Sequence, residues 1–508
     1  MHPLLRAAQR AATNAAQKAV EVAGPALKDA LDADRLLQRT TAGLIEVAAQ
    51  RYALEAPAPW KLGEPLKLTL VGYAGTRNTG ADVRVEEMIH QFRHLFGDDH
   101  LDLSIFTMDP ELTRGYFRTV KQVHFPDVFP KFLFDHVHTQ HGVITCEGSM
   151  FKSKFANALS TLMVGALGLA SAENKLAIGY GGEAGKMDPP LQDLVRRYCG
   201  DAFIIARNDA SVDVLGALGV SATSGTDTAW TFEPAAPEVG QKLLREAGWD
   251  GETPILAICP INPFWWPVRA DLGKRIANLA TGAHSEEHYK SVYFHHGGAD
   301  VKASQTGYLS AIAGAVRALR QEREFFPILV GMEQLDRKAC EELAPMIGGE
   351  PPLFISDEHD MYTMISVTRQ CHAMVSSRYH GIVTTMPGGV VSAGITMDER
   401  IRNLMIDRGT PELALEVDDP QLEQKLLPTL RRLFDEADTL RDGIEACVVD
   451  NLVRMGEMGI ALVDHVREHH PDFPFAEGLG SGGDPWDHLP PLPPTVQAIV
   501  KRQKGRAA

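Results

Sequence analysis

The chain has 508 residues, of which 44% are hydrophobic, 23% charged and 7% aromatic. This composition is typical of a soluble globular enzyme and excludes a mostly disordered chain, a fibrous protein and a coiled-coil rod. The 50 lysines and arginines are outnumbered by 66 aspartates and glutamates, which gives a net charge of −16. Long-range attraction to nucleic acid or to an anionic membrane is therefore not expected, and an anionic substrate would need a local basic pocket.

The six cysteines are scattered without a C-x-x-C pair, a pattern that favours buried thiols in a reducing compartment over disulfides. The basic, Ala-rich N-terminus lacks the continuous apolar segment of a secretory signal. Residues 155–172 carry no charge, but small and polar residues dilute their hydrophobicity, which favours a buried helix over a membrane span. We therefore expect a cytoplasmic protein with no integral membrane segment and no nucleic-acid partner.

Residues 1–60 are predicted to form a helical N-terminal extension, because leucines recur there at helical spacing. Pro57 and Pro59 end this pattern and mark a linker. The helices of this extension could mediate pairing into a homo-oligomer.

Residues 65–235 and 250–415 each alternate short apolar runs with helical segments, and a Pro- and Glu-containing stretch separates them. The expected strands are 66–71, 101–106, 142–146, 175–179 and 202–206 in the first part, and 255–259, 326–330, 353–355, 373–376 and 390–393 in the second. Strand–helix alternation indicates a parallel sheet covered on both faces. We predict an α/β protein with two Rossmann-like, doubly wound domains in a GT-B-like arrangement, with ligands in a cleft at the carboxyl ends of the strands.

The C-terminal part is predicted to differ from both domains. Residues 416–470 are expected to form long helices, and residues 471–508 a flexible tail that is rich in Pro and Gly and basic at its end. The two domains would thus carry helical extensions at both ends.

Two loops follow predicted strands of the first domain. The first, containing Gly75, Asn78, Gly80 and Asp82, leads from a strand into a helix, whose N-terminus favours an anion. It matches neither the G-x-G-x-x-G pattern nor a P-loop, and a tight turn without a ligand explains it equally well. The second is Glu147-Gly148-Ser149. This loop follows a strand at the same edge of the sheet and could also bind a ligand. The alternative is a turn without a ligand, in which Lys152 is solvated.

Two further segments carry cations at the ends of strands. Arg207 ends a strand and can bind a carboxylate or phosphate with a forked contact, although a structural salt bridge explains it nearly as well. Arg378-Tyr379-His380 follows the predicted strand 373–376. Because Arg378 and His380 lie two residues apart in an extended turn, both side chains could face one side of the cleft, where His380 could hold a phosphate or deliver a proton.

Together these segments resemble the polysaccharide pyruvyl transferase family, whose members add a pyruvate ketal from phosphoenolpyruvate to a sugar. The resemblance covers about residues 66–409, in the family's order. It rests on a G-x-x-G-x-x-N-x-G loop ending at Gly80, an R-x-x-x-S-x-x-x-L-x-x-L-G segment starting at Arg207, an R-L-H element at Arg378–His380 and a D-x-K element at Asp398–Arg400. The chain has Ala81 at the family's acidic position, Glu147 for Gly, Tyr379 for Leu and Arg400 for Lys.

The resemblance implies a ketal pyruvyltransferase that binds phosphoenolpyruvate as donor and a sugar or glycan as acceptor. Its expected catalytic residues are Arg207, Arg378 and His380, with the arginines holding carboxylate and phosphate and His380 contacting phosphate or acting as an acid. The expected substrate-binding residues are Gly75, Asn78, Gly80, Asp82, Glu147, Gly148, Ser149, Tyr379, Asp398 and Arg400. The scheme requires no cofactor and no metal, and Asp82 and Glu147 are candidate bases.

Two other functions stay open. The first is a GT-B glycosyltransferase that uses a nucleotide-sugar donor, and the second is a non-catalytic protein that resembles pyruvyl transferases. A zinc site is disfavoured: His284, Glu287 and His288 fit an H-x-x-E-H pattern, but the residues before it begin a helix poorly.

Overall fold

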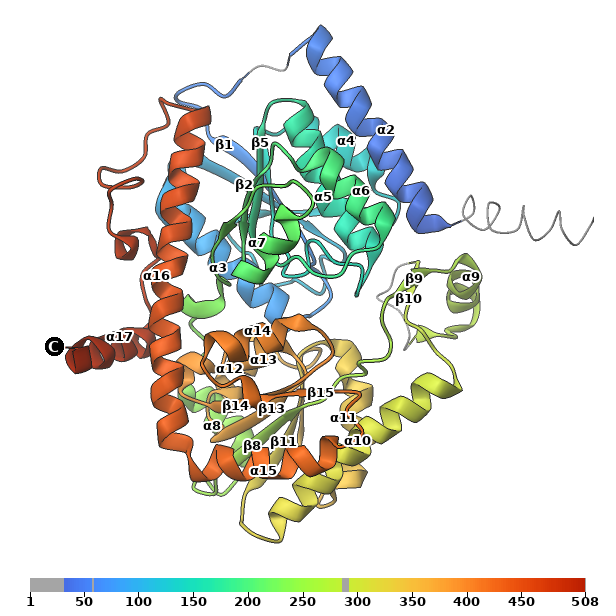
Figure 1. Cartoon of the computed structure of the whole chain (residues 1–508), viewed down its shortest axis with the longest axis vertical. Helices are drawn as coiled ribbons and strands as arrows, with labels where there is room; N and C mark the ends of the chain where they lie inside the picture. Colours follow the sequence, from blue (N-terminus) through green and yellow to red (C-terminus); the bar gives the residue numbers. More distant parts are fainter. Residues whose placement is uncertain (1–31, 57–58, 286–291, 508) are drawn as a thin grey trace, which may run out of the picture.

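A computed structural model of the chain describes residues 32–56, 59–285 and 292–507. Two parallel sheets lie one above the other in Figure 1, each between layers of helices, and the long helix α16 runs along the side of both. This confirms the predicted α/β class with two Rossmann-like domains in a GT-B-like arrangement.

The N-terminal domain is built on a parallel sheet, with seven strands in the described residues, ordered β3-β2-β1-β4-β5-β6-β7. The strands are β1 (Leu66–Val71), β2 (Leu101–Thr107), β3 (Lys121–His124), β4 (Gly142–Thr145), β5 (Leu176–Gly182), β6 (Phe203–Ala206) and β7 (Thr223–Ser224). Both faces of the central strands are buried, which explains their continuous apolar sequences.

Helices cover both faces of this sheet. The helices of this domain are α2 (Ala33–Leu54), α3 (Thr79–Phe96), α4 (Pro130–His138), α5 (Asn157–Ala172), α6 (Pro189–Tyr198) and α7 (Asp209–Gly216). The uncharged α5 lies between the sheet and α2, with both α4 and α6 packed against it. Its apolar composition is that of a core helix, as predicted, and no helix in the described residues is long and apolar enough to cross a membrane.

The C-terminal domain contains a parallel sheet with six strands in the described residues, ordered β12-β11-β8-β13-β14-β15. The strands are β8 (Ile255–Cys259), β11 (Phe326–Gly331), β12 (Leu353–Ile355), β13 (Ala373–Ser376), β14 (Val391–Thr396) and β15 (Ala414–Glu416). An insertion between β8 and β11 holds a small antiparallel pair, β9 (Arg269–Ala270) and β10 (Tyr293–Phe294).

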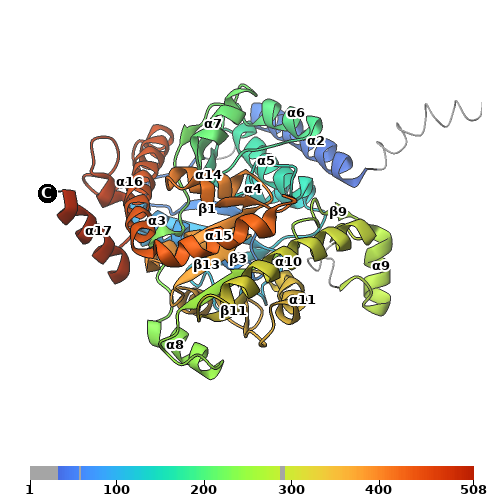
Figure 2. The ribbon, with the colours of Figure 1, turned by 60° about the horizontal axis from the view of Figure 1, so that its bottom comes forward.

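The remaining helices flank this sheet, form its insertion or join the domains (Figure 2). They are α8 (Pro237–Glu246), α9 (Leu272–Thr281), α10 (Ala299–Arg320), α11 (Arg337–Ile347), α12 (Met361–Thr368), α13 (Tyr379–Val383), α14 (Glu399–Asp407), α15 (Leu422–Asp435), α16 (Ala437–His469) and α17 (Pro494–Ala507). The 33-residue α16 contacts β14 of one domain and α3 of the other, so it connects the two cores.

The two sheets share one order of strands. Counting the main strands of each domain along the chain, both sheets read 3-2-1-4-5-6, and the first adds β7 at its edge. In this order the first and fourth strands are neighbours, and the connections that follow them run toward opposite edges of the sheet. The loops after these two strands therefore diverge and leave a crevice at their carboxyl ends, where ligands bind in such folds. The repeat therefore creates the same ligand-binding position twice, at β1/β4 and at β8/β13.

The ten predicted strands all form, with ends shifted by up to three residues, and the described residues contain five further short strands, β3, β7, β9, β10 and β15, that the sequence did not predict. The prediction of a flexible tail at 471–508 is wrong. This segment contains a 3-10 turn at Pro485–His488 and the helix α17, and it buries Phe473, Leu489, Val496 and Ile499. The rings of Trp60 and Phe96 pack against Phe473 at centroid distances of 5.4 and 5.5 Å, so apolar contacts order a segment whose composition suggested disorder.

Val496→Ala should lower the free energy of unfolding by about 1–3 kcal/mol, because it deletes two buried methyl groups and leaves a cavity under α17. Urea unfolding of the full chain measures the change. Lys501→Ala, at an exposed position on the same helix, is the control and should change stability by no more than about 0.5 kcal/mol. Equal stability of both variants would contradict the packing of α17.

Candidate functional site

The loops that leave the carboxyl ends of both sheets meet between the domains. The backbone N–H of Thr79, at the start of α3, donates to the carbonyl of Met332, just after β11, at 2.8 Å. A Cβ built on Gly80 would lie 2.3 Å from the Cβ of His380, so only glycine permits this approach of the domains. The two ligand-binding positions of the fold therefore face one another.

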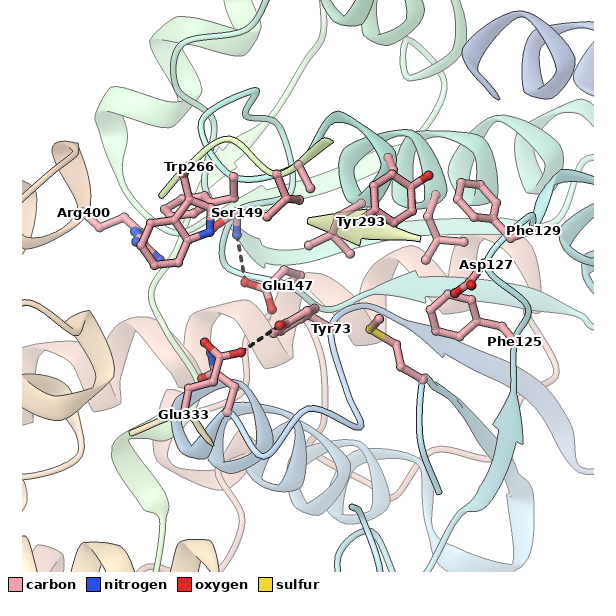
Figure 3. A pocket seen from close by; sticks show the side chains of 18 of the residues that line it. Tyr73, Phe125, Asp127, Phe129, Glu147, Ser149, Trp266, Tyr293, Glu333 and Arg400 are labelled. Carbon is pink, nitrogen blue, oxygen red and sulfur yellow. Dashed lines mark hydrogen bonds between the residues drawn. The ribbon is translucent and has the colours of Figure 1, made fainter. Parts of the chain in front are cut away.

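A cleft lies between these loops (Figure 3). Its polar wall comes from the residues that follow the strands: Tyr73 and Asn78 after β1, Glu147 and Ser149 after β4, Glu333 after β11, Arg378 after β13 and Arg400 after β14. Trp266, after β8, adds an aromatic wall. Strand order thus brings side chains that lie hundreds of residues apart in the sequence into one site.

Arg378 is held by two carboxylates of its own domain. Its Nε donates to Asp336 at 2.9 Å and its Nη2 to Glu333 at 2.7 Å. Glu333 also accepts a hydrogen bond from the hydroxyl of Tyr73 at 2.8 Å, so the cluster crosses the cleft. Burial raises the pKa of both Glu333 and Asp336, and the nearby Arg378 cation opposes that rise.

A second ion cluster is centred on the fully buried Asp227. Its Oδ2 lies 3.3 Å from Nη1 of Arg207, 3.5 Å from Nε of Arg84 and 3.1 Å from Nε2 of His380. Burial alone would raise the pKa of Asp227, but His380 and the two arginines outweigh it and hold this pKa below its usual range. Arg207 also pairs with Glu183.

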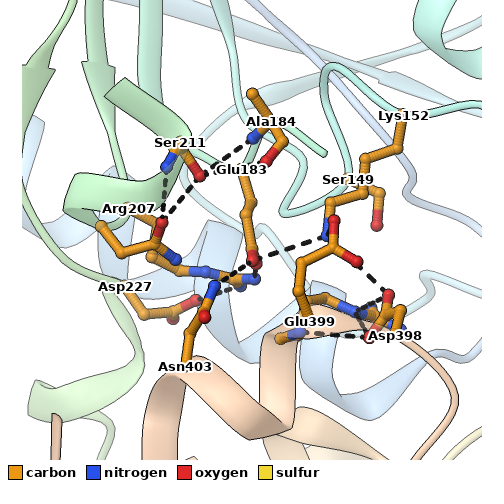
Figure 4. A network of polar contacts seen from close by, with 12 residues as sticks. Ser149, Lys152, Glu183, Ala184, Arg207, Ser211, Asp227, Asp398, Glu399 and Asn403 are labelled. Atoms are coloured by element: carbon orange, nitrogen blue, oxygen red, sulfur yellow. Dashed lines mark hydrogen bonds and ion pairs between the residues drawn. The ribbon is translucent and has the colours of Figure 1, made fainter. Parts of the chain in front are cut away.

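A third set of ion pairs joins the domains at Lys152 (Figure 4). The ammonium of this buried lysine lies 3.1 Å from Glu399 and 3.8 Å from Asp398 of the C-terminal domain, and 3.5 Å from Glu183 of its own. Burial lowers the pKa of Lys152 to about 8, although Asp398 and Glu399 oppose this. Asp398 in turn accepts from Nε of Arg400 at 2.8 Å.

The structure brings Arg207 and His380 together at Asp227, while Arg378 binds a different pair of carboxylates. The expectation that Arg378 and His380 present their side chains to one ligand is therefore not met: Arg378 lines the cleft and His380 does not. Arg207, Arg378 and His380 each have a carboxylate partner, so these residues do not form an uncompensated basic pocket.

The other predicted residues have these positions. Asn78 caps α3 by accepting from the N–H of Ala81 at 3.1 Å, and Gly75 adopts a φ of +93° where a Cβ would collide with Thr107. A Cβ on Gly148 would lie 3.0 Å from Nη1 of Arg207, whose guanidinium stacks on Tyr379 at 4.1 Å.

Asp82 is buried, and no hydrogen bond to its carboxylate oxygens is found in the described part of the chain. Burial raises its pKa well above the usual value, with Arg77 opposing and Glu333 adding to the rise. Asp82 is not among the residues that line the cleft.

The sequence analysis missed the carboxylates that pair with these cations. Glu183, Asp227 and Glu333 each lie within three residues of the carboxyl end of a strand, β5, β7 and β11. Acidic residues at the ends of predicted strands were thus the available signal.

The H-x-x-E-H pattern that was considered as a zinc site lies only partly in the described residues, since Glu287 and His288 fall outside them. α9 ends at Thr281, before His284, and Gly282 caps it with a φ of +72°. Among the described residues no group of three or more His, Cys, Asp or Glu side chains is arranged to hold a metal ion.

Comparisons with known proteins give similarity at the level of structure alone. No family model and no curated protein sequence matches the chain. Among solved structures, the Anabaena protein HepE in complex with UDP-glucose is 11% identical, covers 78% of this chain and 100% of its own, and gives a TM-score of 0.49. UDP-GlcNAc 2-epimerase from Neisseria meningitidis bound to UDP-GlcNAc is 12% identical, with coverages of 74% and 94% and a TM-score of 0.45. The E. coli ADP-heptose lps heptosyltransferase II is 11% identical, with coverages of 73% and 100% and a TM-score of 0.35.

Asp227→Asn should lower the free energy of unfolding at pH 7 by about 3–5 kcal/mol, because it leaves three cationic or proton-binding groups without their buried carboxylate. The control is Asp213→Asn, on the exposed face of α7, which should have little effect. Urea unfolding at several pH values measures both.

The loss of stability caused by Asp227→Asn should depend on pH. Since the folded-state pKa of Asp227 lies below its ordinary value of 3.8, its stabilisation is complete above that value and is lost as the pH falls toward the lowered pKa. The difference between Asp227→Asn and the parent should therefore shrink below about pH 4. A difference that grows in acid would contradict the assignment.

Proposed function

We propose that the cleft is the active site of an enzyme that transfers the pyruvyl group of phosphoenolpyruvate to two hydroxyls of a sugar as a cyclic ketal, with release of phosphate. One observation carries the proposal: residues from all four segments that resemble the pyruvyl transferases gather around this cleft. Asn78, Arg378 and Arg400 line it, and Arg207 lies directly behind Gly148.

Arg378 and Arg400 are the residues proposed to bind the donor. Both line the cleft, and their side chains are 15% and 18% exposed, whereas that of Arg207 is only 3% exposed. A guanidinium presents a planar fork that fits carboxylate or phosphate, so the pair matches the two anionic groups of phosphoenolpyruvate. The carboxylates that now bind these arginines would compete with the donor, which makes its binding sensitive to their charge.

The reaction needs a proton at C3 of the donor and two acceptor hydroxyls at C2. As the first hydroxyl adds, C3 gains a proton; the C2–O bond to phosphate then breaks, and the second hydroxyl adds. Of the two protons that the hydroxyls lose, one ends in the new methyl group and one leaves with phosphate. The positive charge that develops at C2 is stabilised by the adjacent carboxylate and by the fixed charges of the cleft.

Glu333 is the group proposed to supply the proton. It lines the cleft, and because burial raises its pKa, it can hold a proton at a pH where an exposed glutamate is ionised. Glu147 faces the same space, with an oxygen 3.2 Å from the N–H of Ser149, and is proposed as the base for the acceptor hydroxyls. Arg207, His380 and Asp227 hold the loops in place behind these groups.

Titration calorimetry tests the donor assignment. The parent should bind phosphoenolpyruvate saturably, and Arg378→Gln should weaken binding by about tenfold or more, since a charge-assisted contact is worth about 1.5–3 kcal/mol. Arg402→Gln, which changes an arginine on the exposed face of α14, is the control and should bind phosphoenolpyruvate as the parent does.

UDP-glucose, the ligand of HepE, is titrated in parallel: binding of UDP-glucose without binding of phosphoenolpyruvate would favour a nucleotide-sugar transferase. Donor binding without phosphate release over a screen of sugar acceptors would favour a non-catalytic protein.

Phosphate release should also depend on the proton of Glu333. Activity should fall as the pH rises through the raised pKa of this carboxyl, because the acid form is consumed. Glu333→Gln should lower kcat by about 10²–10⁴-fold and remove this alkaline limb from the pH profile. Glu341→Gln, on the exposed side of α11, should leave the profile unchanged. An alkaline limb that persists in Glu333→Gln would assign the acid to another residue.

A further inference from the structure

The two ends of the cleft differ in chemistry. The end nearest the ion clusters carries the polar residues Glu147, Glu333, Arg378 and Arg400. The other end, where Figure 3 shows Phe125, Phe129 and Tyr293, is lined by apolar and aromatic side chains. Figure 3 shows Asp127 beside them, and the other apolar residues that line the cleft are Met108, Phe155, Ala156, Ala158, Leu159, Leu162 and Val268.

The apolar end is built by elements that the proposed chemistry does not use. Ala158, Leu159 and Leu162 come from the first turns of α5, and Phe125 and Phe129 come from the loop between β3 and α4. Val268 and Tyr293 come from the insertion around β9 and β10, which reaches over from the C-terminal domain. Phe129 and Leu162 are buried in the domain core, whereas Phe125 and Leu159 are only half-buried, so a fixed wall presents an apolar surface to the cleft.

This end is a poor place for a sugar. Every hydroxyl of a sugar that is buried there would need a hydrogen-bond partner, and the polar side-chain groups of its lining are the carboxylate of Asp127 and the hydroxyl of Tyr293. An aliphatic or aromatic group is instead stabilised by losing its contact with water. The polar end, with Glu147, Ser149 and Trp266, offers the hydrogen bonds and the aromatic face that a sugar requires.

We propose that the acceptor is an amphiphile, in which a sugar at the polar end carries an apolar group that binds between Phe125, Phe129 and Tyr293. This inference deepens the proposed function and rests on it. The reacting hydroxyls then lie beside Glu147 and Arg378, and the apolar group fixes the sugar's orientation. It thereby contributes binding energy remote from the bonds that change.

Apolar side chains continue beyond the pocket. Val128, between the lining residues Asp127 and Phe129, is 73% exposed. On α9, within the same insertion that supplies Val268 and Tyr293, Ile276 and Leu279 are 68% and 70% exposed. The exposed Val128, which follows a lining residue directly, is consistent with an acceptor whose apolar part is longer than the pocket.

A series of n-alkyl β-D-glucopyranosides tests the inference without phosphoenolpyruvate. Methyl, butyl, hexyl and octyl glucosides are titrated into the full chain by calorimetry, below the concentration at which each forms micelles. The affinity of the parent should rise by about three- to fourfold for each added methylene that enters the pocket. No binding of the octyl glucoside, or an affinity that does not depend on chain length, would overturn the proposal.

Two variants locate the gain in the pocket. Leu159→Asn makes the wall polar, and Ala158→Phe fills the space with a side chain, so each should abolish most of the octyl-over-methyl gain. Leu54→Asn, at a leucine that is 89% exposed on α2, should retain the full gain. An equal gain in the parent and in both pocket variants would place the alkyl chain elsewhere and refute the site.

The same variants separate this inference from the proposed function. Leu159→Asn and Ala158→Phe leave Arg378 and Arg400 unchanged, so both should bind phosphoenolpyruvate with the parent's affinity. If the chain-length dependence holds while phosphoenolpyruvate fails to bind, the donor assignment fails and the amphiphile site stands. If phosphoenolpyruvate binds and chain length has no effect, the acceptor inference alone fails.

Discussion

The buried carboxylate of Asp227 is the group on which the arrangement of the two domains depends. It takes Arg84 and Arg207 from the N-terminal domain and His380 from the C-terminal domain, at 3.1–3.5 Å. Charged groups removed from water are tolerated only when they are paired. Moving the domains apart would remove His380 from Asp227 and also separate Lys152 from Glu399 and Asp398. These ion pairs therefore oppose opening of the cleft and keep its walls in register.

The same clusters explain how an acidic chain can hold so many cations in one place. Arg207 and Arg378, each at the end of a strand, are matched by carboxylates at the ends of other strands, and Arg400 is matched by Asp398 after the same strand, so the site is nearly neutral although it is densely charged. An anionic ligand consequently has to replace existing partners rather than fill an uncompensated positive pocket. The raised pKa of Glu333 and Asp336 assists this exchange, because a protonated carboxyl releases Arg378 more readily than a carboxylate does.

The fold was predictable from the sequence because it depends on local signals. Fully buried strands such as Ile255–Cys259 form continuous apolar runs. In the helices between them, apolar residues recur with the period of about 3.6 residues that is typical of an α-helix. The position of the site followed from the same signals, since ligands bind where parallel strands end. The carboxylates that pair with the site residues could not be predicted from these local signals, because Asp227 lies 20 residues from Arg207 and 153 residues from His380 in the sequence. Only the three-dimensional order of the strands brings them together. The ordered segment after residue 471 was missed for a related reason: Phe473 and Val496 are buried against distant elements, which composition cannot reveal.

The division of the cleft into a charged and an apolar end has a consequence for specificity. None of Phe125, Leu159 and Tyr293 contributes to the ion pairs around Asp227, Glu333 or Lys152, whose partners come from other elements. The apolar wall is built from a loop, one face of α5 and an insertion, all of which can vary without changing the strand order. The proposed binding of the acceptor's apolar group is thus structurally independent of the groups proposed to bind the donor and move protons. A site of this kind can change the molecule that it modifies while the chemistry stays the same, because the two tasks depend on different parts of the chain.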